Sequence, residues 1–183
     1  MNFIETKLKG AYVIELNPLE DERGMFARVF CKKEFSKIKH DKEFVQFNHS
    51  LNEKKGILRG LHYQEPPFAE IKLIRCIRGA LFDVIVDIRK SSSTFLQWTG
   101  VELSETNMKM MYVPEGFAHG FQTLNDSTEL LYHHTNFYEP SAERGIRYND
   151  SMIGIQWPDK VPIISEKDTN YPLLKTGFTG IEL

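Results

Sequence analysis

Hydrophobic residues recur along this chain in short runs, where they either alternate with polar residues or fill most of the run. An alternation of period two places successive side chains on opposite faces of a β-strand, whereas an amphipathic helix needs a period of about 3.6 residues. The pattern therefore predicts strands through most of the chain. The runs are residues 11–16 (AYVIEL), 25–30 (MFARVF), 44–51 (FVQFNHSL), 57–64 (ILRGLHYQ), 71–79 (IKLIRCIRG), 81–89 (LFDVIVDIR), 97–103 (QWTGVEL), 108–114 (MKMMYVP), 116–124 (GFAHGFQTL) and 129–138 (ELLYHHTNFY).

Turn-forming segments separate these runs, among them residues 20–24 (EDERG), 52–56 (NEKKG), 90–94 (KSSST) and 124–128 (LNDST). Many short strands with few helices between them are typical of an antiparallel sandwich or barrel. Residues 31–40 (CKKEFSKIKH) can form one short helix, and the last 40 residues, rich in Pro, Gly, Asp and Asn, predict ordered loop with room for another helix. We therefore expect an all-β fold, a jelly-roll β-barrel with a few short helices.

Period two also predicts which polar side chains share a face of the sheet. Such pairs would give the barrel a polar mouth, where a small molecule could bind. The neighbours His133 and His134 point to opposite faces of a regular strand and cannot chelate a metal together, so we interpret both as structural. The same-face pairs are His62 with Gln64, His119 with Phe121, and Tyr132 with His134.

Composition narrows the function classes. With 183 residues, 41% of them hydrophobic, the chain can bury one core, and we expect a single domain spanning residues 1–183. Its 23 basic and 25 acidic side chains give a net charge of −2, which argues against a nucleic-acid partner. No apolar run approaches the roughly 20 residues that span a bilayer, so we expect no membrane partner and a cytoplasmic protein. Cys31 and Cys76 form no C-x-x-C motif and are interpreted as reduced.

Two half-motifs resemble the cupin signature, in which three histidines and a glutamate hold a metal. They are Gly56-x5-His62-x-Gln64 with Lys72-x6-Gly79, and Pro114-x-Gly116-x2-His119. Here Gln64 stands at the position of the second histidine and Lys72 at that of the glutamate. A charged ammonium has no lone pair and repels a divalent cation, so we expect no metal. Such a cation could instead neutralise negative charge that develops during a reaction.

A larger set of segments resembles the nucleotide-sugar 3,5-epimerase family of the cupin superfamily. The segments are DERG, RGLHYQ, KLIRCIRGALFDVIVDIR, PEGFAHGFQTL, ERGIRYND, IQWP and SEKD, and the likeness runs from about residue 4 to residue 174. The resemblance implies a metal-free, cofactor-independent cupin-like barrel, a cytoplasmic homodimer. It would invert C3, C5 or both in a nucleoside-diphosphate 4-keto-6-deoxyhexose.

The resemblance also implies four catalytic residues. Inverting a carbon beside a ketone requires a base, a group that holds the enolate, and an acid on the opposite face. His62 matches the base, because a neutral imidazole accepts a proton, and Asp168 matches the carboxylate that orients it. Lys72 matches the cation for the enolate oxygen. Tyr132 matches the acid, because a phenol with an ordinary pKa of about 10 has a proton to give at neutral pH.

The remaining matches concern substrate binding. Arg23 and Arg59 match positions that meet the diphosphate, and Tyr138 matches an aromatic residue that stacks on the base. Two residues depart from the family pattern, Arg28 and Phe47, both at positions expected to contact substrate. The other implied binding residues are Phe26, Gln46, Asn48, His119, Glu143 and Lys167.

Three alternatives stay open at this stage. The first is an epimerase that acts only at C3 or only at C5, or on a related sugar such as a CDP-linked one. The second is a metal-dependent cupin oxygenase or isomerase, which predicts bound iron, manganese or zinc. The third is a non-catalytic sugar-binding or regulatory barrel, in which neither His62 nor Tyr132 would be needed.

Overall fold

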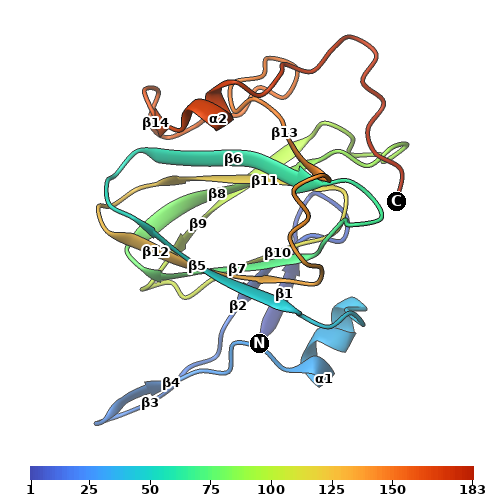
Figure 1. Cartoon of the computed structure of the whole chain (residues 1–183). Coiled ribbons are helices and arrows are strands. Elements are labelled where there is room, and N and C mark those ends of the chain that lie inside the picture. Colours follow the sequence, from blue (N-terminus) through green and yellow to red (C-terminus); the bar gives the residue numbers. More distant parts are fainter.

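Two sheets stacked face to face form the body of the protein in this computed structural model, which describes residues 1–183 (Figure 1). Sheet I has the strand order β1-β2-β10-β7-β12-β5. Sheet II has the order β13-β6-β11-β8-β9, with β14 added parallel to β6. All other neighbouring strands are antiparallel, so the chain passes repeatedly between the two layers of a jelly roll.

The strands of sheet I are β1 (Asn2–Glu5), β2 (Tyr12–Glu15), β5 (Gln46–Asn52), β7 (Lys72–Arg78), β10 (Met110–Val113) and β12 (Thr128–His134). Those of sheet II are β6 (Ile57–Gln64), β8 (Ala80–Asp87), β9 (Trp98–Ser104), β11 (Phe117–Thr123), β13 (Glu143–Gly145) and β14 (Ile163–Ile164). A separate hairpin consists of β3 (Leu19–Asp21) and β4 (Gly24–Phe26). The helices are α1 (Lys32–Phe35), the 3-10 turn η1 (Ser36–Ile38) and α2 (Glu166–Thr169). None of them is long and apolar enough to cross a bilayer.

The alternation along each strand decides which side chains fill the barrel. On β7, Ile74 and Cys76 belong to the apolar core between the sheets, while Leu73 packs on the outer face with Phe35 of α1. Lys72, the first residue of β7, lies two positions before Ile74 and so points to the same side, into the interior. The apolar core fills one part of the barrel, and polar residues line the other.

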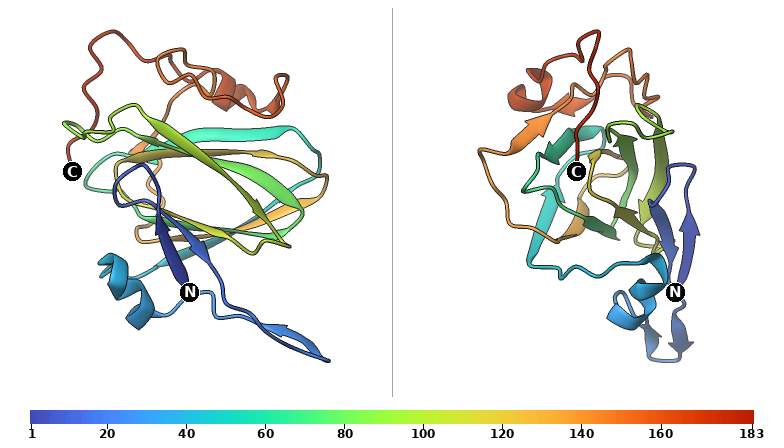
Figure 2. Two further views of the ribbon diagram at one scale, coloured as in Figure 1. Left: turned by 180° about the vertical axis from the view of Figure 1, so that it is seen from behind. Right: turned by 90° about the vertical axis from the view of Figure 1, so that its right-hand side faces the viewer.

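The C-terminal third of the chain covers the outer face of sheet II (Figures 1 and 2). Ile146 and Ile153 are buried there against Val84 and Val86 of β8. This packing places α2 against β6. Asp168 of α2, late in the sequence, thereby reaches Gly60 of β6 and accepts its backbone N–H.

The all-β prediction is confirmed, and residues 31–40 form the expected short helix. The predicted strand at residues 25–30 is wrong beyond Phe26, because the chain there leaves the hairpin and packs Ala27 and Val29 against the outer face of sheet I. The run at 129–138 ends as a strand at His134. Strands β1, β3, β13 and β14 were not predicted, since they are too short to carry a periodic pattern.

The β3–β4 hairpin projects away from the two sheets (Figures 1 and 2). Its apolar side chains are largely exposed: Leu19 by 72%, Met25 by 53% and Phe26 by 68%. Apolar side chains gathered on a projecting element mark a surface that a partner can cover.

Gly60 lets β6 and β11 approach more closely than any side chain would allow. Its φ of +128° lies in a region that favours glycine, and a Cβ there would lie 2.6 Å from the Cα of Gly120 and 2.9 Å from the carbonyl oxygen of His119. The backbone N–H of Gly60 also donates to the carboxylate of Asp168, so the same residue holds α2 against β6.

We expect Gly60→Ala to lower the free energy of unfolding by at least about 2 kcal/mol, through backbone strain plus a clash with immobile backbone atoms. Gly24→Ala is the matched control, because Gly24 has a φ of +124° but nothing within 4 Å of its Cβ position. Thermal denaturation of both variants separates the clash from the strain. Equal losses of stability in the two variants would contradict the close approach.

Candidate active site

A cavity of about 290 Å³ opens between the two sheets. Strands β5, β7 and β12 of sheet I and β6, β11 and β13 of sheet II supply most of its wall (Figure 1). Most of the residues that line it are polar or charged, in contrast to the apolar core beside it. Its residues are Asn48, Ser50, Arg59, His62, Tyr63, Gln64, Glu70, Lys72, His119, Phe121, Tyr132, His134, Tyr138 and Glu143.

His62 and Asp168 form a hydrogen-bonded pair on one side of the cavity. Nε2 of His62 lies 2.7 Å from Oδ1 of Asp168, and Oδ2 accepts the N–H of Gly60 at 3.1 Å. Burial acts to raise the pKa of Asp168, but the hydrogen bond and charge of His62, with the Gly60 N–H, lower it overall. The ionised carboxylate holds the proton of the imidazole on Nε2, which leaves Nδ1 with the lone pair that can accept a proton.

His119 and Asp83 form a second pair on the neighbouring strands β11 and β8. Nε2 of His119 lies 2.7 Å from Oδ1 of Asp83, while Oδ2 is buried without a partner. Burial raises the pKa of Asp83, and the contact with His119 only partly offsets this. This pair lies deeper than the first, since the His119 side chain is 6% exposed and that of His62 is 33% exposed.

Lys72 and His134 share one buried carboxylate, that of Glu70. Nζ of Lys72 lies 2.5 Å from Oε1 of Glu70, and Nδ1 of His134 lies 2.8 Å from Oε2. Burial acts to raise the pKa of Glu70, but the charge of Lys72 and the hydrogen bond of His134 outweigh it and lower the pKa to about 2. Because this folded-state pKa is depressed, the stability that the carboxylate contributes is complete above its ordinary pKa and is lost as the pH falls toward 2.

Tyr132 projects from β12 between two imidazoles of the cavity. Its ring centroid lies 6.2 Å from that of His119 and 6.0 Å from that of His134. Burial and the charge of Asp83 raise the pKa of the phenol, with Arg59 acting in the opposite direction. The phenol therefore keeps its proton at neutral pH and can act as a donor.

The rim of the cavity carries a connected polar group. The hydroxyl of Tyr138 donates to Oε2 of Glu143 at 2.8 Å, and Nζ of Lys167 contacts both oxygens of the same carboxylate at 2.7 Å. Burial acts to raise the pKa of Glu143, and these two partners lower it overall. The backbone N–H of Tyr138 donates to Oε1 of Gln46 at 3.0 Å, which joins the rim to β5.

The donor set does not fit the metal of the cupin signature. Both amide atoms of Gln64 are engaged, since Nε2 donates to the carbonyls of Phe68 and Phe137 and Oε1 accepts the N–H of Glu139. An ammonium, that of Lys72, stands at the glutamate position. No group of three His, Cys, Asp or Glu side chains is arranged to hold a metal ion. These residues argue against the metal-dependent oxygenase or isomerase.

Comparison with known proteins identifies the family. The family described as dTDP-4-dehydrorhamnose 3,5-epimerase matches residues 5–176. The chain belongs to the dTDP-4-dehydrorhamnose 3,5-epimerase family. It is 49% identical to the protein of that name from Shigella flexneri over 171 residues, 93% of this chain and 94% of the relative. The expectation of an isomerase-class epimerase with a cupin-like jelly-roll fold is confirmed.

Solved epimerase structures match over nearly the whole chain. The Bacillus anthracis dTDP-4-dehydrorhamnose 3,5-epimerase, with TDP and PPi bound, has a TM-score of 0.92 and 42% identity, and the match covers 94% of this chain and 99% of that one. The Legionella pneumophila epimerase in complex with dTDP-4-keto-L-rhamnose has a TM-score of 0.89 and 40% identity, with 94% and 92% coverage.

The fold brings most of the sequence-predicted site residues of this epimerase family member to one place. Asn48, Arg59, His62, Lys72, His119, Tyr132, Tyr138 and Glu143 line the cavity. Three others contact lining residues: Asp168 bonds His62, Lys167 pairs with Glu143, and Gln46 contacts Asn48 and Tyr138.

Four predicted positions lie outside this chain's own cavity. Arg23 and Phe26 stand on the projecting hairpin, where Arg23 pairs with Asp21. Arg28 pairs with Glu34 at 3.2 Å, and Phe47 packs against His133 on the outer face of sheet I. The expectation that Arg28 and Phe47 contact substrate therefore finds no support within one chain.

Glu70, Asp83 and His134 are functional candidates that sequence reasoning missed. His134 lines the cavity, on the face of Tyr132 where period two had placed it; its interpretation as structural stays a prediction. His133 does point the other way, toward Phe47. Asp83 lay unremarked inside an apolar strand, and Glu70 lies in a loop, where no periodicity predicts direction.

We expect Asp168→Asn to lower kcat by at least about 100-fold while the fold is kept. The Gly60 N–H would retain the amide oxygen, so the amide nitrogen would face Nε2 of His62. The imidazole proton would then move to Nδ1, the atom that must accept. Steady-state kinetics checks this, with Asp126→Asn as control because Asp126 accepts only the backbone N–H of Lys55. An Asp168→Asn enzyme with wild-type kcat contradicts the pairing role.

Proposed function

We propose that this chain converts dTDP-4-dehydro-6-deoxyglucose to dTDP-4-dehydrorhamnose by inverting C3 and C5. One observation carries the proposal. A single cavity combines an imidazole oriented by a carboxylate (His62 with Asp168), a phenol that retains its proton (Tyr132) and a buried ammonium (Lys72). These are the three groups that proton transfer beside a ketone requires. The family membership and the nucleotide-sugar complexes of similar structures support the same substrate class.

In the first step, Nδ1 of His62 takes the proton from the carbon beside the C4 ketone. The electron pair of the broken C–H bond forms a C=C bond, and the carbonyl oxygen becomes an enolate. Lys72 donates hydrogen bonds to this oxygen, which can stabilise the transition state by about 3 kcal/mol. The ketone of the substrate acidifies the carbon, so the proposed reaction needs no cofactor.

In the second step, the phenol of Tyr132 gives its proton to the opposite face of the same carbon, and the enolate returns to a ketone. His62 and Tyr132 project from different sheets, β6 and β12, which suits attack on two faces of one ring. C3 and C5 both adjoin C4. After the first inversion His62 carries the abstracted proton and Tyr132 is a phenolate. Once His62 has released its proton to solvent and Tyr132 has taken one up from solvent, the same base, cation and acid can serve the second centre.

The rest of the substrate would bind along the same wall. Nε of Arg59 donates to Asn52 at 2.8 Å, which leaves its terminal nitrogens for the diphosphate. Tyr138, exposed by 53% at the rim, offers a ring face to the base. The other proposed contacts are made by Gln46, Asn48, His119, Glu143 and Lys167.

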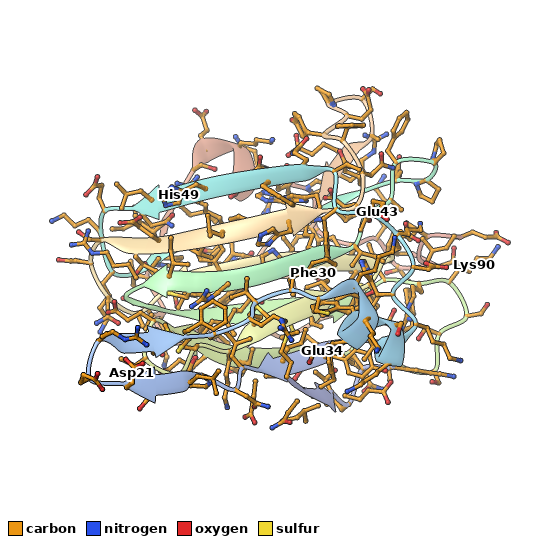
Figure 3. All side chains as sticks on the ribbon, turned by 90° about the horizontal axis from the view of Figure 1, so that it is seen from below. Asp21, Phe30, Glu34, Glu43, His49 and Lys90 are labelled. Carbon is orange, nitrogen blue, oxygen red and sulfur yellow. The ribbon has the colours of Figure 1, made fainter.

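We further propose that the protein is a homodimer that works in the cytoplasm. Arg23 and Phe26 match substrate-binding positions but stand on a hairpin that projects from their own chain. A second copy gives this hairpin a place to pack, and would bring both residues to the partner's cavity. Figure 3 views the protein from the side of the outer face of sheet I, with the projecting hairpin, which carries Asp21, toward the viewer. Both cysteines are free, as the reducing cytoplasm favours.

Deuterium exchange in heavy water tests the roles of the two proton-transfer residues. We expect His62→Ala to abolish exchange of the C3 and C5 protons, and Tyr132→Phe to retain exchange while forming no inverted product. NMR of the sugar nucleotide reports both carbons separately. Wild-type exchange in His62→Ala would remove it as the base, and full inversion by Tyr132→Phe would place the acid elsewhere. Exchange at one carbon only in the wild type would instead favour a C3-only or C5-only epimerase.

Complementation between two inactive variants tests the dimer. We expect light scattering to give twice the chain mass of 21.3 kDa. His62→Ala keeps an intact hairpin, and the double variant Arg23→Ala, Phe26→Ala keeps an intact cavity. Mixed under conditions that allow subunit exchange, the two should recover up to about a quarter of wild-type activity, because half of the chains form mixed dimers with one complete site. A monomeric mass, or no recovery from confirmed mixed dimers, contradicts the shared site.

A further inference from the structure

Glu70 is the one side chain that pairs with the catalytic ammonium proposed above. Lys72 has a long flexible side chain, and its only ion-pair partner in the structure is Glu70, with Nζ and Oε1 2.5 Å apart. The side chains of Lys72 and Glu70 are 9% and 8% exposed. Water therefore has little part in setting where the ammonium lies, and the carboxylate oxygen sets it instead.

The second oxygen of Glu70 is also fixed. Oε2 lies 2.8 Å from Nδ1 of His134. The other ring nitrogen, Nε2, lies 3.4 Å from the side-chain nitrogen of Asn48, which can only donate. Nε2 is therefore an acceptor, and the ring proton lies on Nδ1 and is donated to Glu70. A carboxylate held at both oxygens has little freedom to rotate away from Lys72.

The contact with Glu70 leaves part of the Lys72 ammonium available to a substrate. An ammonium has three donors, and Glu70 takes one, which leaves the others for the cavity. Both Glu70 and His134 line the cavity, and His134 stacks on Tyr132 with an interplanar angle of 22°. The cluster thus connects the cation to the strand that carries the acid.

We propose that Glu70 is a positioning residue, which sets the place of the Lys72 ammonium through its Oε1 acceptor oxygen while His134 holds the carboxylate in orientation. The inference rests on the proposed function, because it assigns Lys72 to the enolate. Its content is geometric: the acceptor oxygen must stand at the right distance from Nζ of Lys72.

Two substitutions separate distance from charge. Glu70→Gln keeps the side-chain length and one acceptor oxygen but removes the charge, whereas Glu70→Asp keeps the charge and withdraws the oxygen by one methylene. We expect Glu70→Asp to lower kcat at least about tenfold and Glu70→Gln to lower it less, with KM changed less than about twofold in both. The opposite order would overturn the proposal, as would wild-type kcat in both variants.

A double-mutant cycle tests whether Glu70 acts through Lys72. In a Lys72→Met background, the exchange assay in heavy water should show Glu70→Asp changing the rate by less than about twofold. An unchanged tenfold loss in that background would mean that Glu70 acts independently, and would overturn the proposal. His134→Phe gives a second variant if Glu70→Asp melts early: we expect a smaller loss of kcat in the same direction, and no loss at all would contradict its orienting role.

Glu129 supplies the matched control on the other face of sheet I. Its carboxylate also contacts a histidine and a basic residue, His49 at 2.9 Å and Arg78 at 3.3 Å, and Figure 3 shows His49 on this outer face. Glu129→Asp and Glu129→Gln should both leave kcat unchanged. Wild-type turnover is measured first: if the wild type epimerises the sugar nucleotide and the Glu70 variants do not follow the expected order, the positioning role fails and the proposed function stands.

Discussion

Most of the charged and titratable side chains inside the barrel are buried, so each of them needs a protein partner. Three carboxylates meet this need around one cavity. Asp168, Asp83 and Glu70 each direct an oxygen to a histidine, and each thereby fixes which ring nitrogen carries the proton. The orientation of the three imidazoles follows from these pairings. An imidazole without its carboxylate would be free to turn, or to carry its proton on the wrong atom.

Strand periodicity predicted much of this arrangement. Every run except 25–30 contains the strand it predicted over most of its length, and the same-face pairing of Tyr132 with His134 holds in the cavity wall. Alternation is informative here because it places successive side chains of a strand on opposite faces of the sheet, one toward the interior and one away from it. It also correctly separated His133 from His134.

The rest depends on contacts between distant parts of the chain. Asp168 lies 106 residues from His62, and only the family resemblance joined them before the fold did. Glu70 precedes its strand in a loop, where neither period nor composition gives a direction. Arg23 was expected near the substrate, but within one chain the hairpin that carries it projects away from the sheets, and strands of three residues are too short for a periodic pattern to predict their direction.

The attachment of α2 to β6 links activity to completion of the fold. His62, the proposed base, belongs to a strand made early in synthesis. Its partner Asp168 arrives on a short helix near the end of the chain, where the N–H of Gly60 holds the carboxylate and the Ser165 side chain caps the helix. A polypeptide still emerging from the ribosome can therefore close most of both sheets and yet lack an oriented imidazole. In this architecture the His62 imidazole gains the carboxylate that orients it only when nearly the whole chain has been made.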